Sequence, residues 1–422
     1  MAENYEEEIQ TALQRNDQIL AAEKAQKYLD RMNNMPLTIA IAGESGSGKS
    51  TLVNALRGIK NKTEGAAPTG VVETTMEPKE YLHPEMPNIR IWDLPGVGTV
   101  NITADKYLEY VEFEKYDFFI IVSGERLTEN DAKLAKEIQK MKKKFYFIRS
   151  KIDNSINSEK EEDPNVQEEE VLTIIRNFCT KGKMFILNLT SPKIFLVSGL
   201  KLHLYEFKDL WETLKEELPE HQRDALLLAL PNISLDVIEQ KKEALDSKIK
   251  WYTLASAAVG AVPVPGLSEA VNLGMIVGFT VHCAVSLGLS PKSLRKLSDL
   301  SGVPYDDLKA KIKFPLSAVE ITTNLLLKVL TSSASLITAI ALQGGVKFAP
   351  IVGIPAAMVL FGVTTYKCLT YILNSLAEDA EVIFKKRGTE HICVNYKYLI
   401  FHTCKNYIVF LFNITDHNNP LL

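Results

Sequence analysis

A glycine-rich turn placed directly after a short apolar run is the feature that most constrains how this sequence folds. The run Leu37–Ala42 has the length and apolar character of a buried strand. The octet Gly43–Ser50 follows without a gap and matches the pattern G-x-x-x-x-G-K-[ST]. Backbone N–H groups in such a turn surround phosphate oxygens, and the helix that follows directs its positive end toward them. The sequence therefore predicts a phosphate-binding loop inside an α/β fold.

The side chains at the end of this turn have distinct expected contacts. Lys49 is expected to reach the β- and γ-phosphates of a nucleoside triphosphate, and Ser50 to ligate Mg²⁺. A helix pattern begins near Thr51, which is the context that a phosphate loop requires. We expect the nucleotide to be lined by Gly43, Glu44, Ser45, Gly46, Ser47, Gly48, Lys49, Ser50 and Thr51.

Short apolar runs alternate with helical patterns through the first half of the chain. The stretches Glu129–Lys143 and Glu168–Asn177 are helical in pattern, whereas the hydrophilic stretch Asn154–Glu170 is expected to be a solvated loop and the start of a helix. Such alternation predicts a mostly parallel sheet covered by helices on both faces. The further apolar runs are Ile89–Trp92, Phe118–Val122, Phe145–Ile148 and Phe195–Val197.

The domain organisation follows from the length and from where the strand patterns stop. A chain of 422 residues exceeds one ordinary hydrophobic core. Residues 3–32 carry apolar side chains near helical spacing, and strand patterns fade after Pro219. We expect an N-terminal helical segment, a nucleotide-binding domain, an all-α domain formed by N- and C-terminal segments, and an atypical tail, with the boundaries 1–34, 35–220, 221–390 and 391–422.

A second motif, Asp93–Gly96, follows the run Ile89–Trp92. An aspartate at a strand end can hold the Mg²⁺ shell, usually through water, and the N–H of Gly96 can sense the γ-phosphate. The same residue types also form ordinary turns. The position of the motif behind a buried strand, downstream of the phosphate loop, favours the phosphate interpretation.

A third motif, Ser150–Asp153, predicts the base. Asp153 can accept hydrogen bonds from N1–H and the exocyclic amino group of guanine, a donor pair that adenine lacks. Lys151 can lay its alkyl stem over the base, and Ser198 and Gly199 are placed to contact it through backbone N–H groups. The alternative is a charged turn after a strand. With the earlier motifs, this one predicts bound GTP or GDP with Mg²⁺.

Candidates for the reaction at the γ-phosphate lie around these motifs. Thr74 and Thr75 both offer oxygen atoms for Mg²⁺ and γ-phosphate, and an exposed threonine pair is the alternative. Val97 stands near the point where many small GTPases place a glutamine that orients water, so intrinsic hydrolysis is expected to be slow or to use another group. Glu77 is a candidate base or a contact to a partner's nucleotide, unless it is a solvated charge. Arg149 is a candidate to supply positive charge across a dimer.

Composition excludes some classes of function. The net charge of −4 offers no sign of the basic face that nucleic-acid binding usually needs, so no nucleic-acid partner is expected. Five scattered cysteines without a CxxC pair fit reduced thiols in the cytosol. The acidic N-terminus does not fit a signal peptide, and Ala2 does not fit N-myristoylation. We expect a cytoplasmic protein.

Taken together, these stretches resemble the interferon-inducible immunity-related GTPase family. The resemblance is most specific over about residues 1–250 and looser through residue 390. The form Gly48-Lys49-Ser50 matches the effector branch of the family, and Ser150 departs from the more usual Thr or Asn. The stretches that carry the resemblance are Ile41–Ser50, Gly65–Tyr81, Ile91–Gly98, Tyr116–Val122, Phe145–Asp153 and Leu230–Val237.

The resemblance implies a Ras-like domain beside a helical domain. It also implies self-association through the nucleotide face, as a dimer or a larger assembly, with hydrolysis stimulated by that assembly. Membranes of vacuoles that enclose intracellular pathogens are the implied site of action. Among the two threonines, the resemblance favours Thr75. We accordingly assign the reaction to Lys49, Thr75, Glu77 and Gly96, and the metal to Ser50, Thr75 and Asp93.

Two apolar stretches bear on membrane association. Phe348–Tyr366 is uncharged and close to the ~20 residues that a membrane span needs, and Thr253–Pro291 carries only one charged residue, Glu269. Buried helices of an all-α domain are equally apolar. Peripheral insertion of one helix or hairpin is the main alternative, ahead of a stable span. Reversible association with intracellular membranes is the expectation.

The leading hypothesis for function is an enzyme that hydrolyses GTP to GDP and phosphate. The alternative is a nucleotide-switched scaffold that binds membranes or partners with negligible turnover, an alternative that Val97 favours. An unrelated membrane-remodelling GTPase would share the same motifs.

Overall fold

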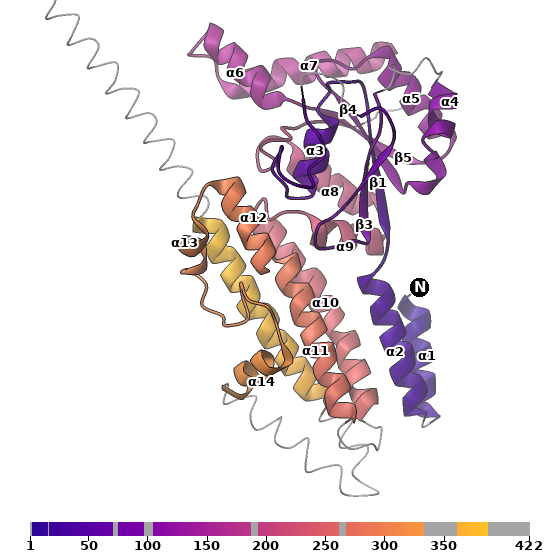
Figure 1. The fold of residues 1–422 in the computed structure, drawn as a ribbon. Coiled ribbons are helices and arrows are strands. Elements are labelled where there is room, and N and C mark those ends of the chain that lie inside the picture. The colour runs from indigo at the N-terminus through magenta and orange to yellow at the C-terminus, as the bar shows by residue number, and fades with distance from the viewer. Residues whose placement is uncertain are drawn as a thin grey trace, which may run out of the picture.

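The computed structural model places a sheet flanked by helices beside a group of long helices (Figure 1). It describes residues 2–15, 17–70, 75–96, 104–186, 193–260, 267–332 and 361–386. Thr74, Val97, residues 348–360 and the tail 391–422 lie outside this part of the chain. The expectations placed on them therefore stay predictions.

A six-stranded sheet forms the centre of the first part. Its strand order is β2-β3-β1-β4-β5-β6, and β2 is antiparallel to β3 while the other pairs are parallel. The α/β fold expected from the alternating pattern is confirmed. The strands are β1 (Leu37–Ala42), β2 (Lys79–Leu82), β3 (Ile89–Asp93), β4 (Phe118–Ser123), β5 (Lys144–Arg149) and β6 (Ile194–Leu196).

The register of the parallel strands aligns their carboxyl ends. Ile41 of β1 lies opposite Asp93 of β3 on one side and Ile120 of β4 on the other. Ser123, at the end of β4, lies opposite Arg149, at the end of β5. The loops that follow β1, β3 and β5 therefore leave the same edge of the sheet, which is where open α/β sheets bind ligands.

Alternating side chains of the strands fill two apolar layers. In β4, Phe118 and Ile120 belong to the cluster that contains residues of α3, α8 and α9, whereas Phe119 and Ile121 belong to the cluster with α4 and α5. A strand that is buried on both faces is apolar throughout, which explains the continuous run Phe118–Val122.

Helices account for most of the remaining described residues. Figure 1 shows α10 and α11 as long helices that lie side by side beneath the sheet, with α2 next to α10. The helices are α1 (Ala2–Gln14), α2 (Gln18–Asn33), α3 (Lys49–Leu56), α4 (Ala104–Tyr110), α5 (Glu129–Lys140), α6 (Ile152–Glu162), α7 (Glu168–Ile186), α8 (Phe207–Glu217), α9 (Glu220–Ala229), α10 (Leu235–Gly260), α11 (Leu267–Ser286), α12 (Pro291–Ser301), α13 (Tyr305–Lys309), α14 (Thr323–Ser332), a 3₁₀ turn η1 (Phe113–Lys115) and a helix over residues 361–386.

The helical pattern over residues 3–32 predicts one amphipathic helix, and this is wrong, because the structure divides the segment into two helices, α1 and α2. Asp17 caps the start of α2 by accepting a hydrogen bond from the backbone N–H of Leu20 (3.0 Å). An aspartate that satisfies a first-turn N–H favours a helix start over a continuous helix. Glu8 and Lys24 then pair across the hairpin at 2.7 Å.

Two more expectations need correction. The stretch Asn154–Glu170 begins inside helix α6 rather than in a loop, because Ile152 and Ile156 bury one face of an otherwise charged helix. Strand β2 was missed because Tyr81 is its single buried residue. An edge strand with only one buried side chain gives almost no apolar pattern.

One apolar cluster continues from the sheet into the helical part. It includes residues of α2, β1, α9, α10 and α11, so α9 packs under the sheet and leads directly into the long helices. Among the described residues, the helical stretch Ala270–Ser301 is long and apolar enough to cross a membrane by length and composition, and 44% of its most apolar window is buried. A core helix meets the same criteria, so both interpretations of Thr253–Pro291 stay open.

Candidate functional site

The phosphate loop between β1 and α3 is shaped by close backbone approach. A Cβ atom on Gly43 would lie 2.1 Å from the carbonyl oxygen of Val122, and Gly48 has a φ of 101°, so side chains would be strained at both positions. Lys49, the first residue of α3, turns its ammonium back into the loop and donates to the carbonyl of Glu44 at 2.8 Å. Its charge is thereby held where phosphate groups are expected.

Three oxygen-bearing side chains meet at the carboxyl end of β3. Ser50 Oγ donates to Asp93 Oδ2 at 2.5 Å, and Thr75 Oγ1 donates to the same oxygen at 3.1 Å. The three residues come from α3, from the segment before β2 and from β3. The structure thus brings together the three residues that the sequence assigned to a metal.

The buried carboxyl group of Asp93 is suited to bind a cation. Its side chain is 0% exposed, and among the described residues its Oδ1 atom has no hydrogen-bond partner. Burial raises the pKa of the Asp93 carboxyl, while the hydrogen bond from Ser50 and the charge of Lys49 lower it. A buried carboxylate oxygen without a partner is costly, and a hard cation such as Mg²⁺ with oxygen ligands would satisfy it.

The proposed base-binding residues lie on two turns that follow β5 and β6. Lys151 is exposed, has a φ of 57° and starts α6, so Asp153 lies in the first turn of that helix and is buried. A Cβ on Gly199 would approach Thr51 Cγ2 at 3.1 Å, which places this turn directly against the start of α3. Ser198 Oγ accepts hydrogen bonds from two N–H groups of its own turn and holds the turn's shape.

Ser150 links the base-binding turn to the phosphate loop. Its hydroxyl lies within hydrogen-bond distance of the carbonyl of Ser47 and, at 3.1 Å, of the carbonyl of Ser123. Gly48 packs closely against this side chain, because a Cβ on Gly48 would lie 3.3 Å from Ser150 Oγ. The small serine side chain therefore fits a tight space and contributes a contact that the sequence did not reveal.

Arg149 cannot play the part that the sequence suggested for it. Its guanidinium donates to the carbonyls of Gly124 and Ser150 and to Ser155 Oγ (3.1 Å) within the same chain, and the residue is buried. A buried, engaged side chain does not reach a second subunit. Arg149 instead braces the turn that carries Lys151.

The remaining residues that the sequence assigned to the site differ in how far they are buried. Gly96 is buried, and the carbonyl of the preceding Pro95 accepts a hydrogen bond from the hydroxyl of Tyr107 (2.8 Å), a contact that no motif predicted. Ser45 and Gly46 are exposed at the tip of the loop. Glu77 is exposed, and no contact among the described residues joins it to the Asp93 cluster.

The Ser150 contact yields a test of how the two loops cooperate. Replacing Ser150 with Ala should weaken GDP binding about fivefold, since one hydrogen bond is worth ~1 kcal/mol. Ser150→Thr should retain the hydroxyl, and Ser158→Ala, at an exposed position of α6, serves as the control. Affinity is measured with a fluorescent guanosine diphosphate. Equal affinities of wild type and Ser150→Ala would show that the link is dispensable.

Comparisons with known proteins show which family of proteins this chain matches. The model of the family "Interferon-inducible GTPase (IIGP)" matches residues 2–387. Interferon-inducible GTPase 5 of Rattus norvegicus is 38% identical over 385 residues, which cover 90% of this chain and 82% of that protein. Interferon-gamma-inducible GTPase 10 of Mus musculus is 34% identical over 381 residues, which cover 90% and 88%. The chain belongs to the interferon-inducible GTPase family.

Proposed function

We propose that this GTPase uses Mg²⁺ and becomes fully active when two or more copies assemble through their nucleotide faces. Guanine-nucleotide binding and GTP hydrolysis come with membership of the family. The observation that supports the metal is the Asp93 cluster, in which Ser50 and Thr75 converge on one carboxylate and its second oxygen is buried without a partner among the described residues.

Each residue of the site has its own proposed role in GTP hydrolysis. Water attacks the γ-phosphorus, and the bond between that phosphorus and the oxygen bridging it to the β-phosphorus breaks. GDP and inorganic phosphate are released, together with the proton that the water loses. Lys49 offsets charge on the β- and γ-phosphates, and the N–H of Gly96 is offered to the γ-phosphate. Mg²⁺, held by Ser50, Thr75 and Asp93, would neutralise further phosphate charge. Asp153 selects the guanine base.

Assembly is supported by exposed apolar side chains next to the site. Met76 follows Thr75 and is 67% exposed, and Leu200 follows Gly199 and is also 67% exposed. Large apolar side chains at this exposure suit a contact with another protein surface better than water. Glu77, exposed beside Met76, would then reach the partner's nucleotide.

Membrane action in cell-autonomous innate defence completes the proposal, with the protein moving reversibly between the cytoplasm and intracellular membranes. The support is the apolar stretch Ala270–Ser301, where Val271 and Val281 are each 40% exposed. Sodium carbonate should release the membrane-bound fraction, because a peripheral helix lacks the continuous apolar contact of a span. Retention in the pellet would contradict peripheral association.

The assembly proposal predicts concentration-dependent turnover. Specific GTPase activity of the wild type should rise with protein concentration, and Met76→Glu should weaken the rise at least about fivefold, as expected from losing ~1 kcal/mol at an interface. Leu300→Glu, an exposed apolar position on α12, is the matched control. Phosphate release and sedimentation are measured in parallel. Flat activity over a wide concentration range, or stable GTP-bound assemblies that release no phosphate, would contradict the proposal.

A further inference from the structure

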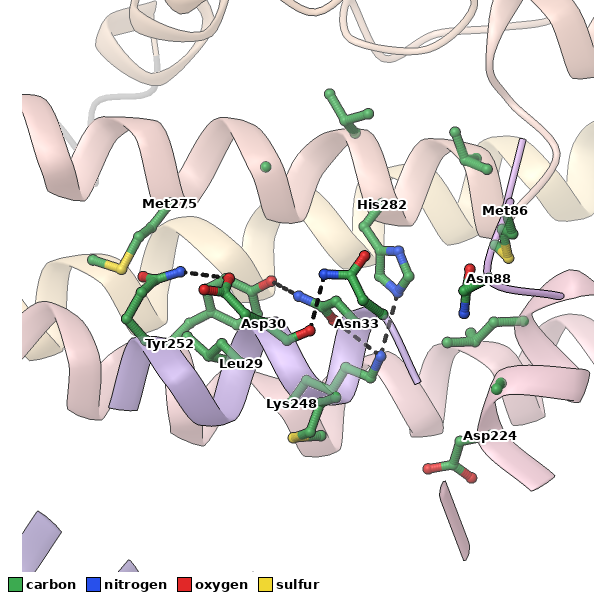
Figure 2. A pocket seen from close by; sticks show the side chains of 18 of the residues that line it. Leu29, Asp30, Asn33, Met86, Asn88, Asp224, Lys248, Tyr252, Met275 and His282 are labelled. Carbon is green, nitrogen blue, oxygen red and sulfur yellow. Dashed lines mark hydrogen bonds between the residues drawn. The ribbon is translucent and has the colours of Figure 1, made fainter. Parts of the chain in front are cut away.

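A cavity of about 560 Å³ lies where the N-terminal hairpin, the sheet part and the long helices meet. Its walls are contributed by α2, by the β2–β3 turn around Met86, by α9, and by α10 and α11 (Figure 2). This volume falls within the ~300–1,000 Å³ typical of small-molecule sites. The cavity is separate from the nucleotide site, since none of the residues assigned to the nucleotide lines it.

The cavity contains a buried lysine with only neutral hydrogen-bond partners. Lys248 is 3% exposed, and its Nζ lies 3.3 Å from Asn33 Oδ1 and 3.3 Å from His282 Nε2 (Figure 2). Burial and the charge of Lys248 lower the pKa of His282 to about 3, so the imidazole is neutral and accepts the hydrogen bond. Among the described residues, no carboxylate lies within 4.0 Å of Lys248 Nζ.

Lys241, a second buried lysine on α10, has an acceptor for each of its three N–H donors. Lys241 Nζ donates to the carbonyls of Leu230 (2.5 Å) and Ser286 (2.7 Å) and to Asn232 Oδ1 (2.9 Å). Three short contacts match the three donors of an ammonium group. Lys248 has two longer contacts and faces a cavity, so the structure leaves it with capacity for one more acceptor.

The acidic residues that line the cavity, Asp30, Glu85 and Asp224, already have partners. Asp30 Oδ1 accepts from Gln26 Nε2 at 2.9 Å. Asp224 Oδ1 accepts from Arg223 Nε at 3.1 Å. Glu85 accepts from Ser293 Oγ at 2.6 Å and pairs with Lys296 at 3.4 Å. Burial lowers the pKa of Lys248 to about 8, and the charge of Asp224 opposes this shift without forming an ion pair with Lys248. Lys248 is thus the lysine of the lining that can donate to a ligand, and the nearby carboxylates would repel a ligand with several negative charges.

Apolar side chains share the rest of the lining with polar residues such as Asn33, Asn88 and His282, and one wall is open. Gly274 and Gly278 of α11 both line the cavity, and a Cβ atom built on either meets nothing within 4 Å. A ligand body can therefore lie against the backbone of α11. The apolar side chains of the lining include Leu29, Met86, Leu228, Met275, Val281 and Val285.

We propose that this cavity binds a small amphiphile with one anionic head group, which accepts a hydrogen bond from Lys248 while its apolar body lies along Gly274 and Gly278. A single buried cation favours one negative charge, and the apolar part of the lining, along α11 and around Met86, favours a hydrocarbon body. A medium- or long-chain carboxylate has this chemistry. Because the walls come from α2, α9, α10 and α11, the ligand contacts both parts of the protein.

The test is calorimetric titration of the full chain with decanoate, with 1-decanol as the neutral ligand of equal length and inorganic phosphate as the anion without a chain. Decanoate should bind saturably, and decanol and phosphate should bind at least about tenfold more weakly, as expected when a charge-assisted hydrogen bond or the apolar contact is lost. Lys248→Met should weaken decanoate binding by a similar factor. Lys242→Met, at a half-buried position of the same helix that does not line the cavity, should leave it unchanged.

Gly278→Leu separates binding from folding. The new side chain projects into open space and replaces a glycine in a helix, so the thermal unfolding temperature should not fall, while decanoate binding should be lost. The proposal is overturned if wild type does not bind decanoate, if Gly278→Leu binds it as tightly as wild type, or if decanol binds as tightly as decanoate.

Discussion

The buried carboxylate of Asp93 is the point on which the nucleotide site converges. The pairing of β3 with β1 places Asp93 opposite Ile41, two residues before the phosphate loop begins. One oxygen of the carboxylate collects hydroxyls from Ser50 and Thr75, and the other is buried without a partner among the described residues. A carboxyl group in this setting is unfavourable by itself. Its placement is understandable if a cation joins it when nucleotide binds.

The loops around Asp93 are held by direct contacts rather than by the sheet alone. Ser150 reaches the carbonyl of Ser47, and Gly199 packs against Thr51, so the base-binding turns and the phosphate loop position one another. Arg149 stabilises the turn after β5 through hydrogen bonds to the carbonyls of Gly124 and Ser150. The other end of β3 is also anchored, because the β2–β3 turn carries Glu85 onto the start of α12. The strand that ends in Asp93 therefore runs from the helical part to the cluster of Ser50, Thr75 and Asp93.

Sequence patterns predicted the parts of this protein where chemistry or burial restricts the residue types. The phosphate loop needs glycine at Gly43 because a carbonyl approaches closely, and β4 is apolar on both faces because helices cover both. The break at Asp17 and the edge strand β2 were missed, since one capping residue or one buried tyrosine gives a weak signal. Contacts between distant segments were also missed. The burial of Arg149 and the link through Ser150 depend on how β4 and β5 end beside the phosphate loop, which a local pattern does not contain.

The most direct measurement of the central claim is the effect of Mg²⁺ on GTP dissociation from wild type and from Asp93→Asn. Asparagine keeps the shape of the side chain and can still accept from Ser50, but it removes the negative charge. Stopped-flow release of a fluorescent GTP analogue should be slowed by Mg²⁺ in the wild type and nearly insensitive to Mg²⁺ in the variant. An equal Mg²⁺ response in both proteins would show that the metal is not held at Asp93 and would contradict the account.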